Sequence, residues 1–322
     1  MDNDDTCSTI SASTATGTVS RTSSTMTSVV TSADGTPAPS VYSYRSGRDG
    51  HAMLREIAGR TLNTTNDLYL LPADEGEHGR LDKQHLVGLL SVGGLYVATR
   101  EFTLGLEHYY NSFDVVHARC TANGVKDFEG FVHEAAKCVR AGGVLLFTEG
   151  NLEMQNEQLN GQEPAFGDGG PGQSWLARAT FEAYNLMKGR GSYVDAGLML
   201  ERWMLSCPDL TDVHSRELLT PVGPWKKGPT PEETQRLQMI GTLMRQNMKE
   251  FVRSCKPMFV ATGFPPALIE RFMEGTDKEL DELSIHMYVK WHHAWARRVD
   301  GPNQLRAATE LSVTSEAMSV DG

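Results

Sequence analysis

Four side chains that could take part in chemistry lie at or just past the ends of two short apolar runs. His117, Arg119 and Cys120 close the first run, and Glu149 directly follows the second. An imidazole can act as a general base, and a guanidinium can hold a carboxylate through two hydrogen bonds. Each position also has a structural interpretation. His117 can be a hydrogen-bonded core histidine, which we favour, while Arg119 can form an ion pair at a strand end and Glu149 can be a solvated edge residue.

The two runs belong to a predicted strand–helix–strand unit over residues 113–150. The valine-rich run 113–118 and the run 144–148 are typical of buried parallel strands. Asp127 can cap the helix between them, and Gly142 with Gly143 is expected to end it. Such a unit closes right-handed into a parallel sheet, and α/β sheets bind ligands at the carboxyl ends of their strands. The apolar face of the helix is made of Phe128, Phe131, Val132, Ala135, Cys138 and Val139.

The amino-acid sequence of this unit resembles part of the class I S-adenosylmethionine-dependent methyltransferases. Their fourth strand, following helix and fifth strand read FDxVxxR … LxxGGxLxxxE. A second block, residues 55–96, resembles the helical lead-in of a fungal group of these enzymes that includes regulators and tailoring enzymes of secondary metabolism. The resemblance covers about residues 42–300. The matching lead-in positions are Arg55-Glu56-Ile57, Gly59-Arg60, Asn66-Asp67, Tyr69, Leu71-Pro72-Ala73-Asp74, Arg80-Leu81-Asp82-Lys83-Gln84-His85 and Gly93-Gly94-Leu95-Tyr96.

The resemblance implies a Rossmann-like α/β fold, S-adenosylmethionine as cofactor and a small-molecule acceptor. In that fold the residues just past the fourth strand lie by the methionine end of the donor. This makes His117 the candidate catalytic base and Arg119 and Cys120 candidate cofactor-binding residues, with Glu149 facing the same crevice. Helices before the first strand often cover the cofactor as a lid. Two lead-in residues, Arg60 and Tyr69, are therefore further candidates for cofactor binding, although either could instead tie the lid together.

The chain departs from the family between the lead-in and the fourth strand. There the family has a glycine-rich turn, D-x-G-x-G-x-G, and an acid for the ribose hydroxyls. Here Tyr96 is followed by VATREFTLGLEHYYNS and then at once by Phe113, and the stretch GDGGPG at 167–172 is expected to be a loop. We therefore expect a truncated fold without strands one to three, and weak donor binding.

That departure leaves other functions open. One alternative is a catalytically inactive methyltransferase-like protein with a regulatory or binding role, and another is a truncated gene product. A dinucleotide oxidoreductase on a similar sheet is disfavoured, because it has no counterpart of the lead-in.

Residues 150–300 are expected to complete the sheet around inserted helices. Helices are predicted at about 174–206 and 230–275, the first capped by Ser174 and the second by a capping box that starts at Thr230. The runs 213–222 and 285–295 have strand character. In the family the sixth and seventh strands form an antiparallel pair beside the fifth, and helices inserted before them commonly build the acceptor pocket.

Composition narrows the expected partners and location. The net charge of −11 and the pI near 5.4 argue against a nucleic-acid partner, which would need a basic surface. No apolar stretch approaches the ~20 residues of a membrane span and none reads as a signal peptide, so we expect a cytoplasmic or nuclear protein without a membrane partner. The pair His292-His293 lacks a third ligand in the sequence, so no metal site is predicted.

The domain organisation is expected to follow the resemblance. The Ser/Thr-rich residues 1–41 and the tail 301–322 cannot bury enough apolar surface to order, and are expected to be disordered. Residues 42–100 are predicted to form the helical lead-in, and residues 101–300 the methyltransferase-like core.

The position of the fourth strand predicts how the chain associates. The family sheet runs 3-2-1-4-5-7-6, so a chain without strands one to three has its fourth strand at an edge. The run 113–118 is unprotected by proline or lysine, and an apolar edge pairs with whatever strand it meets. We therefore expect self-association through residues 113–118, unless residues 97–112 fold back to cover them.

Overall fold

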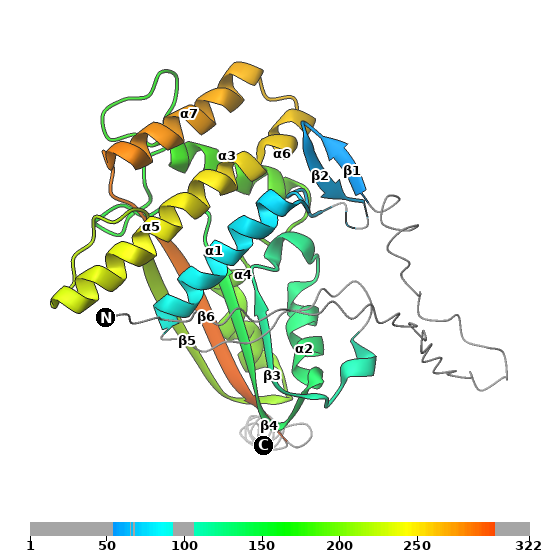
Figure 1. The fold of residues 1–322 in the computed structure, drawn as a ribbon. Helices are drawn as coiled ribbons and strands as arrows, with labels where there is room; N and C mark the ends of the chain where they lie inside the picture. Colours follow the sequence, from blue (N-terminus) through cyan, green and yellow to red (C-terminus); the bar gives the residue numbers. More distant parts are fainter. Residues whose placement is uncertain (1–53, 65, 67, 93–105, 300–322) are drawn as a thin grey trace, which may run out of the picture. The chain divides into compact units, whose positions relative to one another are not determined.

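The main sheet has four strands, which confirms the predicted α/β class. The computed structural model describes residues 54–64, 66, 68–92 and 106–299. β3 and β4 run parallel, and β6 is antiparallel to both of its neighbours. This order matches the 4-5-7-6 half of the family sheet. The strands are, in spatial order, β3 (Phe113–Arg119), β4 (Val139–Gly150), β6 (Tyr288–Arg298) and β5 (Leu210–Pro221) (Figure 1).

The crossover helix between the two parallel strands is α2 (Phe128–Cys138), and its cap is as predicted. The Asp127 carboxylate accepts a hydrogen bond from the Gly130 backbone N–H at 2.9 Å. The predicted end of the helix is wrong, because Val139 is already extended and pairs with Phe113 in the sheet. Gly143 therefore lies inside β4. A Cβ there would lie 2.6 Å from the Asp114 carbonyl oxygen, so the glycine allows the two strands to approach.

One face of the sheet is covered by α2 and α4 (Ala196–Ser206). Side chains on this face alternate along the strands, so that Leu145 and Phe147 of β4 point the same way as Ala294 and Ala296 of β6. All four are buried with Phe128 and Trp203, whose rings stack at 5.6 Å.

The other helices lie beyond the opposite face and the strand ends, where α1 and α5 cross in front of the sheet (Figure 1). Two of their starts are capped as predicted: Ser174 accepts from Ala177 N at 3.0 Å, and Thr230 accepts from Glu233 N at 3.2 Å. The last helix runs to Glu282, past the predicted end of the helical region near residue 275. These helices are α1 (Glu75–Val92), α3 (Trp175–Gly189), α5 (Pro231–Ser254), α6 (Lys256–Ala261) and α7 (Pro266–Glu282).

The lead-in is not helical throughout, contrary to the prediction. It begins with a hairpin of β1 (Leu54–Ile57) and β2 (Arg60–Asn63), and α1 starts only at Glu75. Ala58 and Gly59 both have positive φ, 52° and 74°, which is the backbone that a two-residue hairpin turn needs. Two short 3-10 turns complete the elements, η2 (Glu107–Tyr109) and η3 (Ala122–Gly124).

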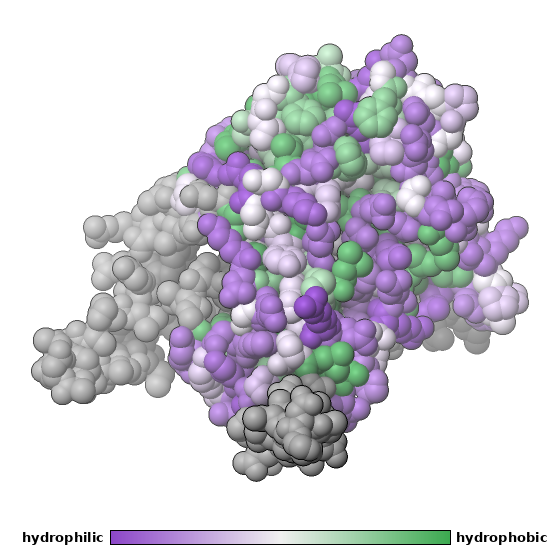
Figure 2. Space-filling view, turned by 180° about the vertical axis from the view of Figure 1, so that it is seen from behind, coloured by the Kyte–Doolittle hydropathy of each residue, from purple (hydrophilic) through white to green (hydrophobic). Residues whose placement is uncertain are grey.

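Other predictions concern the terminal segments, the segment before β3, one glycine-rich loop and membrane spans. The tails 1–41 and 301–322 and most of the segment 97–112 lie outside the described residues. The stretch 167–172 is a loop as predicted, with Gly167, Gly169 and Gly172 at positive φ. Across the described ranges, no helix is long and apolar enough to cross a membrane. Figure 2 shows one face of the molecule, on which hydrophilic side chains are interspersed with small separate groups of apolar ones.

Candidate functional site

A small cavity lies where the sequence predicts a site, at the carboxyl ends of β3 and β4. Its volume is about 90 Å³. Helices α1 and α5 close it from above, and β6 contributes one wall. Three predicted site residues, Tyr69, Cys120 and Glu149, line it. The remaining lining residues are Leu71, Arg80, Leu81, Gln84, Ala122, Asn123, Gly150, Asn151, Leu152, Met154, Asn247, Met248, Phe251, Val289 and Trp291.

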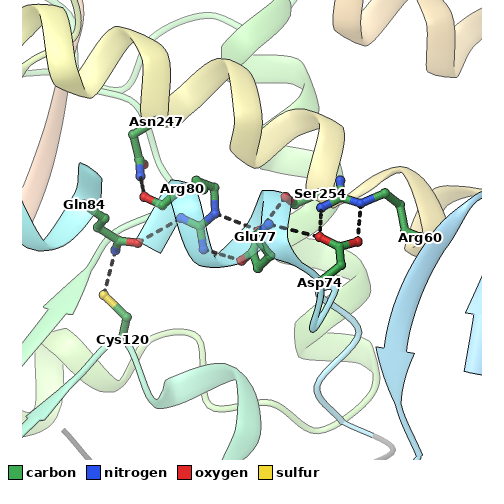
Figure 3. Close-up of polar contacts among 8 residues, drawn as sticks. All are labelled: Arg60, Asp74, Glu77, Arg80, Gln84, Cys120, Asn247 and Ser254. Carbon is green, nitrogen blue, oxygen red and sulfur yellow. Dashed lines mark hydrogen bonds and ion pairs between the residues drawn. The ribbon is translucent and has the colours of Figure 1, made fainter. Parts of the chain in front are cut away.

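A buried ion pair on α1 joins Arg80, which lines the cavity, to Glu77 (Figure 3). The Arg80 guanidinium donates to both carboxylate oxygens of Glu77, at 3.0 and 2.5 Å, and to the Gln84 side-chain oxygen at 2.8 Å. Arg80 and Glu77 are 4% and 1% exposed, so each charge depends on the other for compensation. Helical spacing explains the arrangement, because positions three and four apart lie on one face of α1.

Two residues of α5 hold the Glu77–Arg80 pair in place through hydrogen bonds (Figure 3). Ser254 donates its hydroxyl to Glu77 at 2.5 Å, and Asn247 donates its amide to the Arg80 carbonyl oxygen at 3.1 Å. Both are buried. The register of α1 on α5 is thus set by hydrogen bonds as well as by apolar packing, since each buried polar group needs its partner.

Glu149 is the titratable side chain of the cavity that can change charge near neutral pH. It is 3% exposed, and burial raises its pKa to about 7. Hydrogen bonds from the Thr121 backbone N–H at 2.8 Å and hydroxyl at 3.0 Å partly oppose that rise. A carboxyl group poised in this range can both accept and donate a proton. The solvated edge interpretation of Glu149 is therefore wrong.

Cys120 lies at the end of β3 in a left-handed conformation, with φ at +54°. Its backbone N–H donates to the Thr148 carbonyl at 2.9 Å, and its sulfur accepts from the Gln84 amide at 2.9 Å. Non-glycine residues rarely adopt this backbone, and such positions cluster at functional sites. Burial raises the pKa of the thiol to about 12, so it packs as a neutral group and not as a nucleophile.

His117 and Arg119 lie beside the cavity and are absent from its described lining. Both point to the face of the sheet under α1, where Arg119 Nη1 lies 2.7 Å from His85 Nδ1. The Thr148 hydroxyl lies 3.4 Å from His117 Nε2 and 3.0 Å from His293 Nδ1. Burial lowers the pKa of both histidines to about 4, which keeps them neutral. The placement agrees with the core interpretation of His117, and its catalytic role stays a prediction.

Arg60 is held away from the cavity. It pairs with Asp74 through two hydrogen bonds of 2.7 and 2.8 Å, next to the start of α1 (Figure 3). The guanidinium lowers the pKa of Asp74 to about 2. Asp74 also accepts from the Glu77 backbone N–H at 3.0 Å, so this pair anchors the first turn of α1. The geometry agrees with the interpretation that Arg60 ties the lead-in together.

Sequence reasoning missed Arg80, Gln84 and Asn247. The first two stand in the lead-in string, four residues apart, and that spacing was the available signal. Asn247 carried none, because its role depends on a contact with a residue 167 positions earlier in the chain. Over the described ranges, no group of three or more His, Cys, Asp or Glu side chains could hold a metal ion.

The described residues do not fit the whole methyl donor. The cavity is several times smaller than the roughly 300–1,000 Å³ of small-molecule sites. Its polar lining, Arg80 with Glu149 and several amides, could meet one charged end of a ligand. The sequence supplies no glycine-rich turn or ribose acid for an adenosine half.

Comparisons with known proteins agree with the resemblance to fungal methyltransferases. No protein-family model matches the chain. It is 25% identical over 198 residues to the secondary metabolism regulator laeA of Coprinopsis cinerea, covering 62% of this chain and 47% of that protein. It is 27% identical over 177 residues to the methyltransferase pytC of Aspergillus terreus, covering 54% and 49%.

Among solved structures, phosphoethanolamine N-methyltransferase 2 of Haemonchus contortus in complex with S-adenosyl-L-methionine matches with a TM-score of 0.29 and 16% identity. The match covers 59% of this chain and 34% of that one. The score is too low to carry an argument. The present chain spans about half the length of the curated relatives it matches. Over that half, its sequence is similar to a fungal regulator of secondary metabolism and to a fungal methyltransferase, in agreement with the resemblance.

Proposed function

We propose that this chain is a methyltransferase-like protein that acts on a small molecule in secondary metabolism, with S-adenosylmethionine as the methyl donor. The observation that carries the proposal is the meeting of Tyr69, Cys120 and Glu149 in one cavity at the carboxyl ends of β3 and β4. In this proposal the donor's methionine end lies at that point of the sheet, as the resemblance implies. We also propose a cytoplasmic or nuclear location.

The affinity of this chain for the donor is low in this proposal. The Arg80 guanidinium is already paired with Glu77 and Gln84, and the cavity holds about 90 Å³. A ligand that enters must therefore displace buried hydrogen bonds, whose loss costs free energy. The same two observations favour the second candidate function, a catalytically inactive protein with a regulatory or binding role.

Titration calorimetry of the full chain with S-adenosylmethionine and with its demethylated product tests the affinity. We expect heats too small to fit, or a Kd far weaker than 10 μM, with pytC as the positive control. A Kd in the low micromolar range would show that the donor site is formed.

Transfer of a labelled methyl group separates the two candidate functions. The donor is supplied at millimolar concentration, where weak binding still fills the site, together with a panel of small phenols, acids and amines. Transfer that falls at least tenfold in Glu149→Gln supports the enzyme. Absence of transfer to every acceptor favours the regulatory role.

A further inference from the structure

Glu149 stands at one end of a row of side chains that crosses the sheet beneath α4. It pairs directly with His292 of β6, which in turn pairs directly with Glu217 of β5. Residues directly opposite one another on neighbouring antiparallel strands have their side chains on the same face, with Cβ atoms about 4.5–5.5 Å apart. Three titratable groups therefore lie in line, from the cavity across β6 to β5.

The two ends of this row differ in their access to water. Glu149 is buried and lines the cavity, whereas the Glu217 side chain is 56% exposed. The Glu217 carboxylate lies 3.4 Å from His292 Nδ1 through Oε1, and 3.4 Å from Lys290 Nζ through Oε2. The row thus connects a buried carboxyl group to a solvated one through a single imidazole.

The orientation of the His292 ring turns its second nitrogen inward. The residue is 8% exposed, and its Cδ2 lies 2.8 Å from where a Cβ would stand on Gly197, so α4 packs directly on the ring. Because Nδ1 faces β5, the Cδ2–Nε2 edge of the ring faces away from β5, on the side of Glu149. Nε2 is buried and has no hydrogen-bond partner among the described residues. Such an atom calls for an explanation, since buried polar groups are nearly always paired.

The groups around His292 determine which nitrogen carries its proton. Those that face it are Glu149 from β4, Glu217 from β5 and Lys290 from its own strand, and α4 meets it with the uncharged Gly197. Burial lowers the pKa of the imidazole, so the ring is neutral at pH 7 and carries one proton. With that proton on Nδ1, toward the Glu217 carboxylate, Nε2 is an acceptor on the side of Glu149.

We propose that His292 relays protons between Glu149 in the cavity and Glu217 at the surface. As the Glu149 carboxyl group gives its proton to Nε2, the Nδ1–H bond breaks, and that proton passes to the Glu217 carboxylate and on to water. The imidazole is neutral before and after, and only its tautomer changes. His292 therefore acts through Glu149 and does not touch the ligand.

This inference rests on the proposed function, in which Glu149 takes a proton from the acceptor. A bound ligand fills the cavity and leaves the row through His292 as the route to water. When the cavity empties, a proton returns by the same route and Glu149 releases it into the cavity, which restores the first tautomer. The relay thus lets Glu149 ionise while the ligand is bound.

The tautomer of His292 tests the proposal without any ligand. NMR of the full chain with ¹⁵N-labelled histidine reports which ring nitrogen carries the proton. We expect His292 to change from Nδ1–H to Nε2–H as the pH rises through about 7, the pKa of Glu149, because the ionised carboxylate attracts the proton to its side. In Glu149→Gln this change should be lost.

His293 is the control within the same spectra. It points to the opposite face of the sheet, toward Thr148, and should keep one tautomer over this pH range. A His292 tautomer that stays constant through pH 7 in the parent chain would overturn the proposal. So would a change that survives in Glu149→Gln or that His293 shows equally.

Transfer of a labelled methyl group tests the outer end of the row. Glu217→Gln removes the carboxylate that takes the proton and leaves every residue of the cavity lining in place. We expect kcat to fall by roughly tenfold with KM unchanged. Glu274→Gln, at an exposed carboxylate of α7, should change neither, and equal effects of the two variants would contradict the relay. Absence of transfer in the parent chain would count against the proposed function, while the tautomer measurement still decides the relay.

Discussion

The two edges of the main sheet differ in how they are protected. β5 carries charged side chains along its length, a register irregularity between Thr211 and His214, and Asp212 in a left-handed conformation with φ at +53°. β3 has a short valine-rich sequence and exposed apolar side chains. Bulges and charges are the devices by which natural edge strands avoid pairing with other chains.

The difference shows that, among the described strands, β3 has the sequence of an interior strand in the position of an edge. In the family sheet its counterpart is flanked on both sides, whereas the counterpart of β5 is an edge in every member with the order 3-2-1-4-5-7-6. Two nearby ion pairs also differ in burial: the Glu77–Arg80 pair near the end of β3 is buried, whereas the Glu217 carboxylate that pairs with Lys290 beside β5 is exposed.

The largest difference between the regions around β3 and β5 is expected in the free energy of unfolding that is lost when these ion pairs are broken. Arg80→Ala leaves Glu77 buried and unpaired, and should lower the free energy of unfolding by about 3–5 kcal/mol. Glu217→Gln, which removes the exposed carboxylate that pairs with Lys290 and lies 3.4 Å from His292 Nδ1, should cost at most about 1 kcal/mol. Urea denaturation of both variants gives the comparison, and similar losses would contradict it.

The pH dependence of the free energy of unfolding should reveal the raised pKa of Glu149, which lies near the end of β4, the neighbour of β3. Its folded pKa, about 7, lies above the ordinary value of 4.5, so the fold favours the protonated form. The stabilisation is complete below about pH 4.5 and is lost as the pH rises through 7. Glu149→Gln should therefore be more stable than the parent at pH 8, by on the order of 3 kcal/mol, and equally stable near pH 4.5.

This measurement has an internal control in the histidines. Their lowered pKa values make the parent and Glu149→Gln lose stability together as the pH falls from about 6.5 to 4. Only the difference between the two curves reports on Glu149. A constant difference from pH 4.5 to 8 would show that its pKa is not raised.

A smaller effect is expected at the protected edge itself. Asp212→Val puts a β-branched residue at positive φ and should cost about 1–2 kcal/mol. Because the irregularity of β5 depends on this backbone, the variant should also associate more readily through β5. Asp212→Gly keeps the conformation accessible and serves as the control. Equal melting temperatures for the two variants would mean that the irregularity does not depend on residue 212.

The smallest effect is expected from the cap of the helix that supports β3. Asp127→Ala removes the hydrogen bond to Gly130 and should cost about 1 kcal/mol. Asp127→Asn retains a cap and should be nearly neutral. Thermal melting of the two variants distinguishes a local loss of α2 from a general effect of the lost charge.

Much of the fold could be predicted because its signals are local. The strand–helix–strand unit, the caps at Asp127, Ser174 and Thr230 and the strands β5 and β6 all follow from periodicity and capping chemistry within a few residues. The end of α2 and the hairpin β1–β2 were predicted wrongly. At these two places sheet pairing and a turn of Ala58 and Gly59 outweighed helical propensity.

The sequence by itself determined which residues end the parallel strands, and with them that Cys120 and Glu149 lie at the carboxyl ends of β3 and β4, where α/β sheets bind ligands. Tertiary structure decided which neighbours they meet. It put His85 of α1 beside Arg119, and it lined the cavity with Arg80 of α1 and Asn247 of α5. The reason is that a strand fixes the direction of its own side chains by alternation, whereas the partners above a strand end come from distant segments. Packing alone brings those segments together.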